Sequence, residues 1–350
     1  MKTILVTGGC GFIGSHTCLC LLKNNYKIVV VDSNINSSKL SLKNIKKIFE
    51  LNNLVMQEIF FKKGDIRDEE FLKKVFLQAK NNGNPIEGVV HFAGLKSVEE
   101  STKDPLIYWD NNVCGTLTLL KVMKLFKCKT IVFSSSATIY GNPKINPIKE
   151  SFAIKPLNPY GQTKASIEYI LEGIFKGFQK NWKVANLRYF NPIGAHESGL
   201  IGEEPLNKPN NLFPYISLVA SGKYKKLNIY GKNWPTHDGT GIRDYIHVMD
   251  LAEAHTCAIN YLFDKGPNLL NLNIGTGVGT SVLELVETFE EVNKCKIPYE
   301  FCNRRQGDVA TLIADNERAI SLLQWNPKRN LKDMCKDGWR WRQINPNGYE

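Results

Sequence analysis

The sequence predicts an α/β protein built on a parallel, doubly wound sheet, and three observations point to this fold class. A short apolar run at residues 3–7 leads directly into a glycine-rich turn and an amphipathic stretch. Further apolar runs alternate with long helical stretches. The 350 residues, 43% of them hydrophobic, suffice for two modest domains or for one domain with a large insertion. Such alternation implies a parallel sheet that binds ligands at the carboxyl ends of its strands.

The first apolar run, "TILVT", is followed by "GGCGFIGSHTCLCLLKNN", which predicts a tight turn that opens a helix. Gly9, Gly11 and Gly14 fit G-x-G-x-x-G, and Gly8, Gly11 and Gly14 fit the wider G-x-x-G-x-x-G. Glycines at these places permit the turn, let the backbone approach a pyrophosphate, and let the helix pack closely on the strand. Because the motif lies between a strand and a helix, we predict a Rossmann-type dinucleotide site.

The second apolar run, "KIVVVD", ends in Asp32, 18 residues beyond Gly14. An acidic residue at this place accepts hydrogen bonds from the adenine ribose, and its charge repels a 2′-phosphate. We therefore predict NAD rather than NADP as the cofactor. The alternative is a carboxylate that only caps the turn after the strand.

Four further strands are predicted at "IFFKKGDI", "IEGVVHFAG", "KTIVFSSS" and "VANLRYF". Helical stretches around residues 69–82, 105–127 and 159–180 lie between or beside them. Several polar or small residues fall at the carboxyl ends of these strands, where ligands are expected: Asp65, Ala93, Gly94, Ser134 and Ser136. Taken singly, each could also belong to an ordinary loop or cap a helix.

The stretch "NPYGQTKASIE" begins the third of these helices, with Asn158 as its N-cap and Pro159 in its first turn. Tyr160 and Lys164 are four residues apart and share a helical face, so the ammonium is expected to lower the pKa of the phenol from about 10. A doubly wound sheet would bring Ser136 beside this helix. Tyr160 would then accept a hydroxyl proton while Ser136 holds the oxygen. An exposed Tyr–Lys pair without function is the alternative.

Charge and cysteine content narrow the possible partners. The chain has a net charge of +11 and a pI of about 9.1, but its lysines are scattered in short groups that match no nucleic-acid-binding motif. Its nine cysteines have no regular spacing, so we expect reduced thiols and no metal site. The first residues lack the features of a signal peptide, and no window nears about 18 consecutive apolar residues. We expect a cytoplasmic protein that binds neither nucleic acid nor membrane.

Nearly the whole chain resembles the extended short-chain dehydrogenase/reductase family, and most closely its UDP-galactose 4-epimerases. The matching blocks are "VTGGCGFIGSHT", "GDIRD", "HFAGLKSV", "DNNVCGTL", "FSSSATIYG", "PYGQTK", "LRYFNPIGAH", "NNLFPYI", "DGTGIRDYIHVMDLA", "NIGTGVG" and "RRQGDVA". The resemblance implies reversible C4 epimerisation of UDP-glucose and UDP-galactose through a transient 4-keto sugar and enzyme-bound NAD. It also implies a homodimer formed through the helices around 105–127 and 159–180.

The resemblance further implies which residues contact each ligand. NAD contacts are expected from Gly8, Gly11, Phe12, Ile13, Asp32, Asn34, Asn36, Asp65, Ile66, Phe92, Ala93, Gly94, Lys96, Asn111, Tyr160, Lys164 and Phe190. The glycine motif and a strand end add Gly14 and Ser134 to this set. UDP-sugar contacts are expected from Ser136, Tyr160, Asn191, Asn211, Leu212, Tyr230, Arg243, Arg305, Asp308 and Leu312. The catalytic group would be Tyr160, Lys164 and Ser136.

The domain organisation implied by the resemblance has two parts. Residues 1–190 would form the NAD-binding Rossmann domain, and residues 191–350 would form a smaller α/β domain that binds the UDP-sugar. A segment around 243–265 would return to pack on the first domain.

Other NAD-dependent nucleotide-sugar enzymes of this fold, dehydratases and decarboxylases, are the nearest alternative. They place an acidic residue just after the serine or threonine of the fifth strand, and this chain has Ala137 and Thr138 there. Neither side chain can act as a general acid near neutrality. A non-enzymatic NAD-sensing module would have no use for Tyr160 and Lys164.

Leu312 bears on which sugars are accepted. In the epimerases that the chain resembles, this position lines the space beside the 2-substituent of the sugar, with Tyr in relatives confined to unacetylated hexoses and a small residue such as Cys in dual-specificity relatives. Leu is intermediate in size, so we expect turnover of UDP-N-acetylglucosamine that is slower than turnover of UDP-glucose. The alternative is that Leu312 is a core residue and other side chains close the pocket.

Overall fold

The computed structural model describes all residues except 178–180, 206–208, 210, 306 and 350. Its main feature is a seven-stranded parallel sheet with the strand order β10-β6-β5-β4-β1-β2-β3. The strands are β1 (Thr3–Thr7), β2 (Lys27–Asp32), β3 (Ile59–Lys63), β4 (Ile86–His91), β5 (Thr130–Ser136), β6 (Lys183–Tyr189) and β10 (Asn268–Ile274). The chain builds outward from β1 to β3 and then returns to β4, so the predicted doubly wound sheet is confirmed. Its switch point lies between β1 and β4, where ligands bind in such folds.

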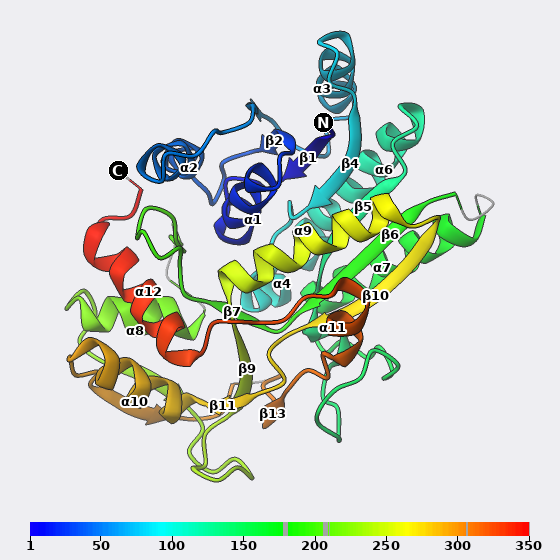
Figure 1. Cartoon of the computed structure of the whole chain (residues 1–350). Helices are drawn as coiled ribbons and strands as arrows, with labels where there is room; N and C mark the ends of the chain where they lie inside the picture. Colours follow the sequence, from blue (N-terminus) through cyan, green and yellow to red (C-terminus); the bar gives the residue numbers. More distant parts are fainter. Residues whose placement is uncertain (178–180, 206–208, 210, 306, 350) are drawn as a thin grey trace.

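Helices cover both faces of this sheet (Figure 1). One face packs against α1 (Phe12–Lys23), α2 (Leu40–Leu51), α9 (Val248–Asp264) and α11 (Glu317–Leu323). The other packs against α3 (Glu69–Asn81), α6 (Gly115–Leu125) and α7 (Pro159–Gly177). Successive residues of β1 alternate between the two apolar clusters: Ile4 and Val6 belong to the first and Leu5 to the second. Because both faces are buried, the strands are apolar throughout, and this made them readable in the sequence.

The helical stretch expected over 105–127 consists of three elements. It begins with α5 (Pro105–Tyr108), which follows α4 (Val98–Lys103), continues through the π-helical η1 (Trp109–Cys114) and ends as α6. A π-helical turn has i→i+5 hydrogen bonds in place of i→i+4 bonds, and no feature of "WDNNVC" predicts this change. The start of α7 is as predicted, since Asn158 Oδ1 accepts the Gly161 N–H at 2.8 Å. The end of the predicted helix, at 178–180, lies outside the described residues.

Two smaller sheets lie outside the large one. Strand β9 (Ile242–His247) pairs with β7 (Asn191–Ile193), β11 (Gly279–Ser281) and β13 (Thr311–Leu312), while β8 (Leu227–Tyr230) pairs with β12 (Tyr299–Cys302). The helices around them are α8 (Leu212–Ala220), α10 (Val282–Asn293) and α12 (Leu331–Ile344), which Figure 1 shows together on one side of the molecule. Residues of these strands and helices share a third apolar cluster. Of the helices described, none has the length and apolar character to cross a membrane.

The large sheet also draws on the second half of the chain. Helix α9 packs against α1, and β10 pairs with β6 as the edge strand. The sequence did not predict β10. The division of the chain at residue 190 stays a prediction.

Candidate active site

The glycine turn after β1 leaves no room for a Cβ at Gly8, Gly9 or Gly14. Gly8 has a φ of +70°, a left-handed conformation that favours glycine. A Cβ at Gly14 would lie 2.2 Å from the carbonyl oxygen of Gly8, so a larger residue would push α1 away from the turn. Gly11 precedes α1, and no side chain in the described part of the chain caps this helix. The N–H groups of its first turn can therefore bind an anion such as a pyrophosphate.

Asp32, at the end of β2, has a buried carboxylate that accepts three hydrogen bonds. Oδ2 accepts the Cys10 N–H at 2.9 Å, and Oδ1 accepts the Asn34 N–H at 2.9 Å and the Ser37 hydroxyl at 2.8 Å. This is the turn-capping arrangement given above as the alternative interpretation. A carboxylate has about four lone-pair sites, so capping leaves room for a ribose hydroxyl. The glycine turn and Asp32 together fit NAD.

Other predicted NAD contacts follow the neighbouring strands. Because the strands are parallel, their carboxyl ends lie along one edge of the sheet, next to the glycine turn. This edge carries Ser134 near the end of β5 and residues that follow β3, β4 and β6, namely Asp65, Ile66, Phe92, Ala93, Gly94, Lys96 and Phe190. Phe12 and Ile13 begin α1, Asn36 lies in the exposed turn after β2, and Asn111 lies in η1. The structure thus places the predicted NAD contacts along one edge of the sheet and in the turns beside it.

The predicted catalytic side chains meet where α7 begins beside the end of β5. Lys164 is buried and donates from Nζ to the carbonyl oxygen of Ser134 at 2.6 Å. Its Nζ lies 5.8 Å from the centre of the Tyr160 ring. The Tyr160 phenol forms a hydrogen bond with the side chain of Ser136. Tyr160, Lys164 and Ser136 are therefore neighbours, as the helix spacing and the sheet predicted.

The expected lowering of the Tyr160 pKa by Lys164 is wrong. Burial raises the pKa of the Tyr160 phenol to about 12, against a smaller opposing effect of the hydrogen bond with Ser136. Burial also lowers the pKa of Lys164 to about 7. The hydration that both side chains lose on burial outweighs the attraction between ammonium and phenolate. This is because the ammonium bonds to a backbone carbonyl rather than to the phenol. With these pKa values, Tyr160 keeps its proton near pH 7 and Lys164 is close to half neutral, so the pair includes a base buried near the phenol.

The hydroxyl of Ser136 is oriented by Thr138. Its Oγ accepts the Thr138 N–H at 3.2 Å and the Thr138 hydroxyl at 2.9 Å. The hydrogen of Ser136 is therefore left to donate to Tyr160, which is the direction that stabilises a phenolate. Ala137, which stands between Ser136 and Thr138 in the sequence, is buried. This corner of the site holds hydroxyl groups where a dehydratase would need a carboxyl group.

Four predicted UDP-sugar contacts lie together near β9 and β13. The Arg305 guanidinium lies 4.7 Å from the centre of the Tyr230 ring, and its Nε donates to Asp308 Oδ2 at 3.0 Å. Burial lowers the pKa of Arg243, and the charges of Asp308 and Arg305 also act on it. Tyr230 is 38% exposed. Two guanidinium groups and an accessible aromatic ring suit a diphosphate and a nucleobase.

Leu312 of β13 has neighbours both in this group and near Ser136. It pairs in register with Arg243 on the neighbouring strand β9. It also packs on the buried cluster that contains Ala137 and Phe190. The remaining predicted contacts, Asn191 at the start of β7 and Asn211 and Leu212 at the start of α8, come from other elements.

Glu203 and Asn112 are two residues at the site that the sequence analysis missed. Glu203 Oε1 accepts from Lys96 Nζ at 3.0 Å and from Asn211 Nδ2 at 3.3 Å, so it joins a predicted NAD contact to a predicted UDP-sugar contact. The buried amide of Asn112 bonds both backbone groups of Leu95, at 2.7 and 3.0 Å. The polar run "DNN" inside a predicted helical stretch was a usable signal for Asn112. Glu203 gave none, because its contact with Lys96 spans 107 residues.

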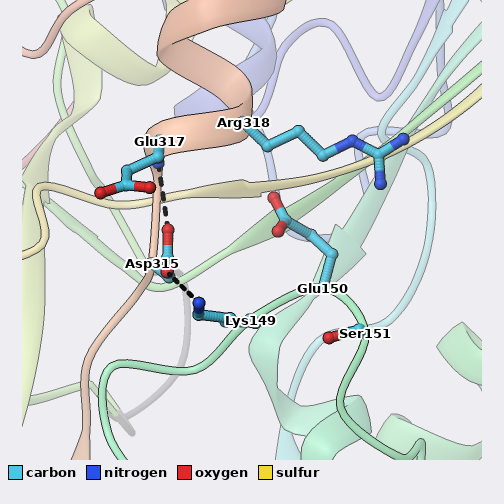
Figure 2. A pocket seen from close by; sticks show the side chains of 6 residues that line it. All are labelled: Lys149, Glu150, Ser151, Asp315, Glu317 and Arg318. Carbon is cyan, nitrogen blue, oxygen red and sulfur yellow. Dashed lines mark hydrogen bonds and ion pairs between the residues drawn. The ribbon is translucent and has the colours of Figure 1, made fainter.

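A polar hollow elsewhere on the molecule lies outside the predicted site. Figure 2 shows its lining, formed by Lys149, Glu150, Ser151, Asp315, Glu317 and Arg318. Lys149 Nζ lies 4.0 Å from a carboxylate oxygen of Asp315. In the ranges that the structure describes, no three His, Cys, Asp or Glu side chains are grouped so that they could hold a metal ion.

Comparisons with known proteins agree with this arrangement. A family model described as GDP-mannose 4,6 dehydratase matches residues 5–338. A UDP-glucose 4-epimerase of Bacillus subtilis is 49% identical over 348 residues, covering 99% of this chain and 98% of its own length. A crystal structure of UDP-glucose-4-epimerase from Stenotrophomonas maltophila with bound NAD and formylated UDP-arabinopyranose matches with a TM-score of 0.93 and 41% identity, covering 99% of both chains.

A second solved structure, UDP-glucose 4-epimerase from Bifidobacterium longum in complex with NAD⁺ and UDP, has a TM-score of 0.92 and 43% identity. It covers 99% of this chain and 100% of its own. The chain therefore belongs to the extended short-chain dehydrogenase/reductase family and, within it, to the UDP-glucose 4-epimerases.

Proposed function

We propose that this chain is an isomerase that interconverts UDP-glucose and UDP-galactose at C4 of the hexose, with NAD as its cofactor. The observation that carries the proposal is the contact between Tyr160 and Ser136 beside the buried amine of Lys164, at the same sheet edge as the glycine turn. The similar UDP-glucose 4-epimerases that were crystallised hold NAD with a UDP-sugar or with UDP. Arg243, Arg305 and Tyr230 supply the groups that a UDP moiety needs.

In the proposed mechanism the side chains manage protons and position the sugar. NAD, when bound, supplies the hydride acceptor and later the donor at the same carbon. Tyr160 accepts the proton of the C4 hydroxyl after passing its own to Lys164, and Ser136 then turns its hydroxyl hydrogen from the phenol oxygen to the sugar oxygen. The UDP moiety stays bound to the arginines while the 4-keto sugar turns over. Tyr160 then returns the proton, so no oxidant is consumed overall.

A dehydratase or decarboxylase activity is not favoured. Elimination of water requires a general acid beside the reacting carbons. Next to Ser136 the chain has only Ala137 and Thr138, and the Thr138 hydroxyl is already bonded to Ser136. The oxidation should therefore lead to inversion at C4 and not to loss of a group.

The experiment that tests this function is incubation of the purified protein with UDP-glucose, followed by separation of the nucleotide sugars. We expect UDP-galactose at equilibrium with UDP-glucose and no accumulation of a 6-deoxy-4-keto sugar. Denaturation of the protein should release NAD, identified by absorbance and mass. A deoxy product in quantity, or a protein that releases no NAD and converts neither sugar, would overturn the proposal.

The N-acetylated sugars provide a prediction about specificity. Because Leu312 is smaller than Tyr and lies beside Arg243, we expect slow turnover of UDP-N-acetylglucosamine, and Leu312→Tyr should abolish it while sparing UDP-glucose. A pocket change of this size is worth about 1–3 kcal/mol, or roughly 10–200-fold in discrimination. Rates for both sugars would be compared on the natural chain and the variant. No acetylated turnover even in Leu312→Ala would mean that Leu312 is a core residue.

A homodimer, a cytoplasmic location and a role in galactose metabolism are further parts of this proposal. Helices α4 to α7 expose apolar side chains, with Leu106 78% exposed and Val98, Ile107, Leu117 and Tyr169 also accessible. Such a group of side chains suits burial against a second copy. Light scattering should give twice the chain mass of 39.6 kDa, and a monomer would exclude the dimer.

The proposed cytoplasmic location rests on the nine cysteines, all of which are free thiols. Cell fractionation would test it.

A further inference from the structure

Side chains on one face of α7 contact three consecutive serines, 134–136, at the end of β5. Tyr160 and Lys164 contact the two outer serines, as described above. One helical turn beyond Lys164, Glu168 accepts a hydrogen bond from the hydroxyl of Ser135. Because residues four apart share a helical face, Glu168 continues the row that holds the catalytic pair. The proposed mechanism gives this buried carboxylate no chemical role.

Glu168 is held by Arg188 of β6, and both side chains are almost fully buried, at 5% and 3% exposure. Arg188 Nη2 donates to Glu168 Oε2 at 2.7 Å, and its Nε donates to Oε1 at 3.0 Å. Its Nη1 donates to the Tyr140 hydroxyl at 2.8 Å and to the Glu150 carbonyl oxygen at 3.0 Å. The Tyr140 hydroxyl in turn donates to Asn273 Oδ1 at 2.7 Å. The pair thus joins α7 to β5, β6, β10 and η2 (Ala137–Tyr140).

The same pair places a carboxylate and a guanidinium near Lys164 without adding a net charge. A carboxylate four residues along the helix would by itself favour the protonated amine, but the Arg188 guanidinium balances it. The other titratable groups that face the catalytic pair are His91 of β4 and Tyr189 of β6. Burial keeps both of these neutral near pH 7.

Groups on the remaining elements packed against α7 do not change this balance. Glu100 of α4 accepts the hydroxyl of Tyr108 of α5 at 3.2 Å, and Arg67 pairs with Asp110 of η1. Burial raises the pKa of Tyr140 in η2 to about 12, so it is also neutral. Along the helical face of Lys164 the next charged side chain is therefore Glu168, which is paired with Arg188 of β6.

We propose that Glu168 and Arg188 are positioning residues for the epimerisation, which fix α7 on β5 so that Tyr160 stays against Ser136 and which keep the surroundings of Lys164 electrically neutral. The inference rests on the proposed function. If the unmodified protein does not turn over UDP-glucose, the proposed function is refuted. The inference is tested separately, by differences in the pH profile and in kcat between the variants and the unmodified protein.

The first test compares the two single charge variants. Glu168→Gln leaves an unpaired cation near the catalytic pair, and Arg188→Met leaves an unpaired anion. A positive potential lowers every nearby pKa and a negative potential raises it. The midpoint of the pH–kcat profile should therefore move down in Glu168→Gln and up in Arg188→Met, each by about one pH unit. The double variant is neutral again, and its midpoint should return to that of the unmodified protein.

A purely structural pair would lower stability without these opposite shifts. The matched control is Arg329→Met, which breaks the ion pair of the partly exposed Arg329 with the buried Asp250 on α9. It should lower the unfolding temperature and leave the pH profile in place. Shifts in the same direction, or no shifts in folded variants, would overturn the proposal.

Ser135→Ala keeps the proposal testable if the charge variants do not fold. It removes the β5 hydroxyl that bonds Glu168 and leaves both charges intact. We expect kcat for UDP-glucose to fall by about tenfold with KM unchanged, since only the placement of α7 is loosened. An unchanged kcat in this variant would overturn the positioning role.

Discussion

Tyr160→Phe is expected to lower the rate of UDP-glucose epimerisation by about 10²-fold or more while the fold and the NAD content are preserved. The substitution keeps the ring and removes only the hydroxyl that bonds Ser136. Without it, no side chain in the proposed mechanism accepts the C4 proton, whereas the proposed NAD contacts at the glycine turn and Asp32 are unchanged. The measurements are kcat for UDP-glucose and the NAD released per chain on denaturation.

The matched control is Tyr169→Phe, on the same helix. Tyr169 lies on the surface proposed for the dimer, where Phe keeps the apolar ring, and it takes no part in the proposed chemistry. This variant should therefore turn over at the rate of the unmodified protein. Near-normal turnover in Tyr160→Phe would show that another group accepts the proton. Loss of NAD together with activity would instead indicate that the phenol mainly holds the cofactor.

Local patterns predicted the elements whose environment is uniform along their length. Strands β1 and β2 have the bounds expected from their apolar runs, because both faces of the sheet are covered by helices. The start of α7 followed from Asn158 and Pro159, whose effects act within one helical turn. β10 escaped prediction because its polar positions, such as Asn271 and Asn273, bond to Asn186 and Tyr140 from distant parts of the chain.

The catalytic site divides in the same way. The helix spacing placed Tyr160 beside Lys164, but not the pKa values of either group, since these depend on how much water the surrounding fold excludes. Arg243, Arg305 and Tyr230 could be assigned only through resemblance to a family. These side chains come from β8, β9 and the segment before β13. No short sequence pattern shows that such distant segments lie together.

Lys164→Met is expected to reduce turnover near pH 7 by about 10²- to 10⁴-fold and to change the shape of the pH profile. In the unmodified protein the Lys164 amine, with its pKa of about 7, receives the Tyr160 proton. Its rate should fall as the pH drops through 7, because a protonated amine cannot accept a proton, and should level off above that pH. The variant has only the phenol, whose pKa burial raises to about 12.

Because the ionised fraction of a group below its pKa rises about tenfold per pH unit, the residual rate of Lys164→Met should climb about 100-fold between pH 7 and pH 9. Lys176→Met, an exposed lysine on the same helix, provides the control and should keep the profile of the unmodified protein. A low rate in Lys164→Met that does not change with pH would mean that the lysine only holds Ser134 and α7 in place. A residual rate that rises with pH would instead show that Lys164 removes the Tyr160 proton. Hydroxide can replace a missing proton acceptor, but it cannot replace a missing structural contact.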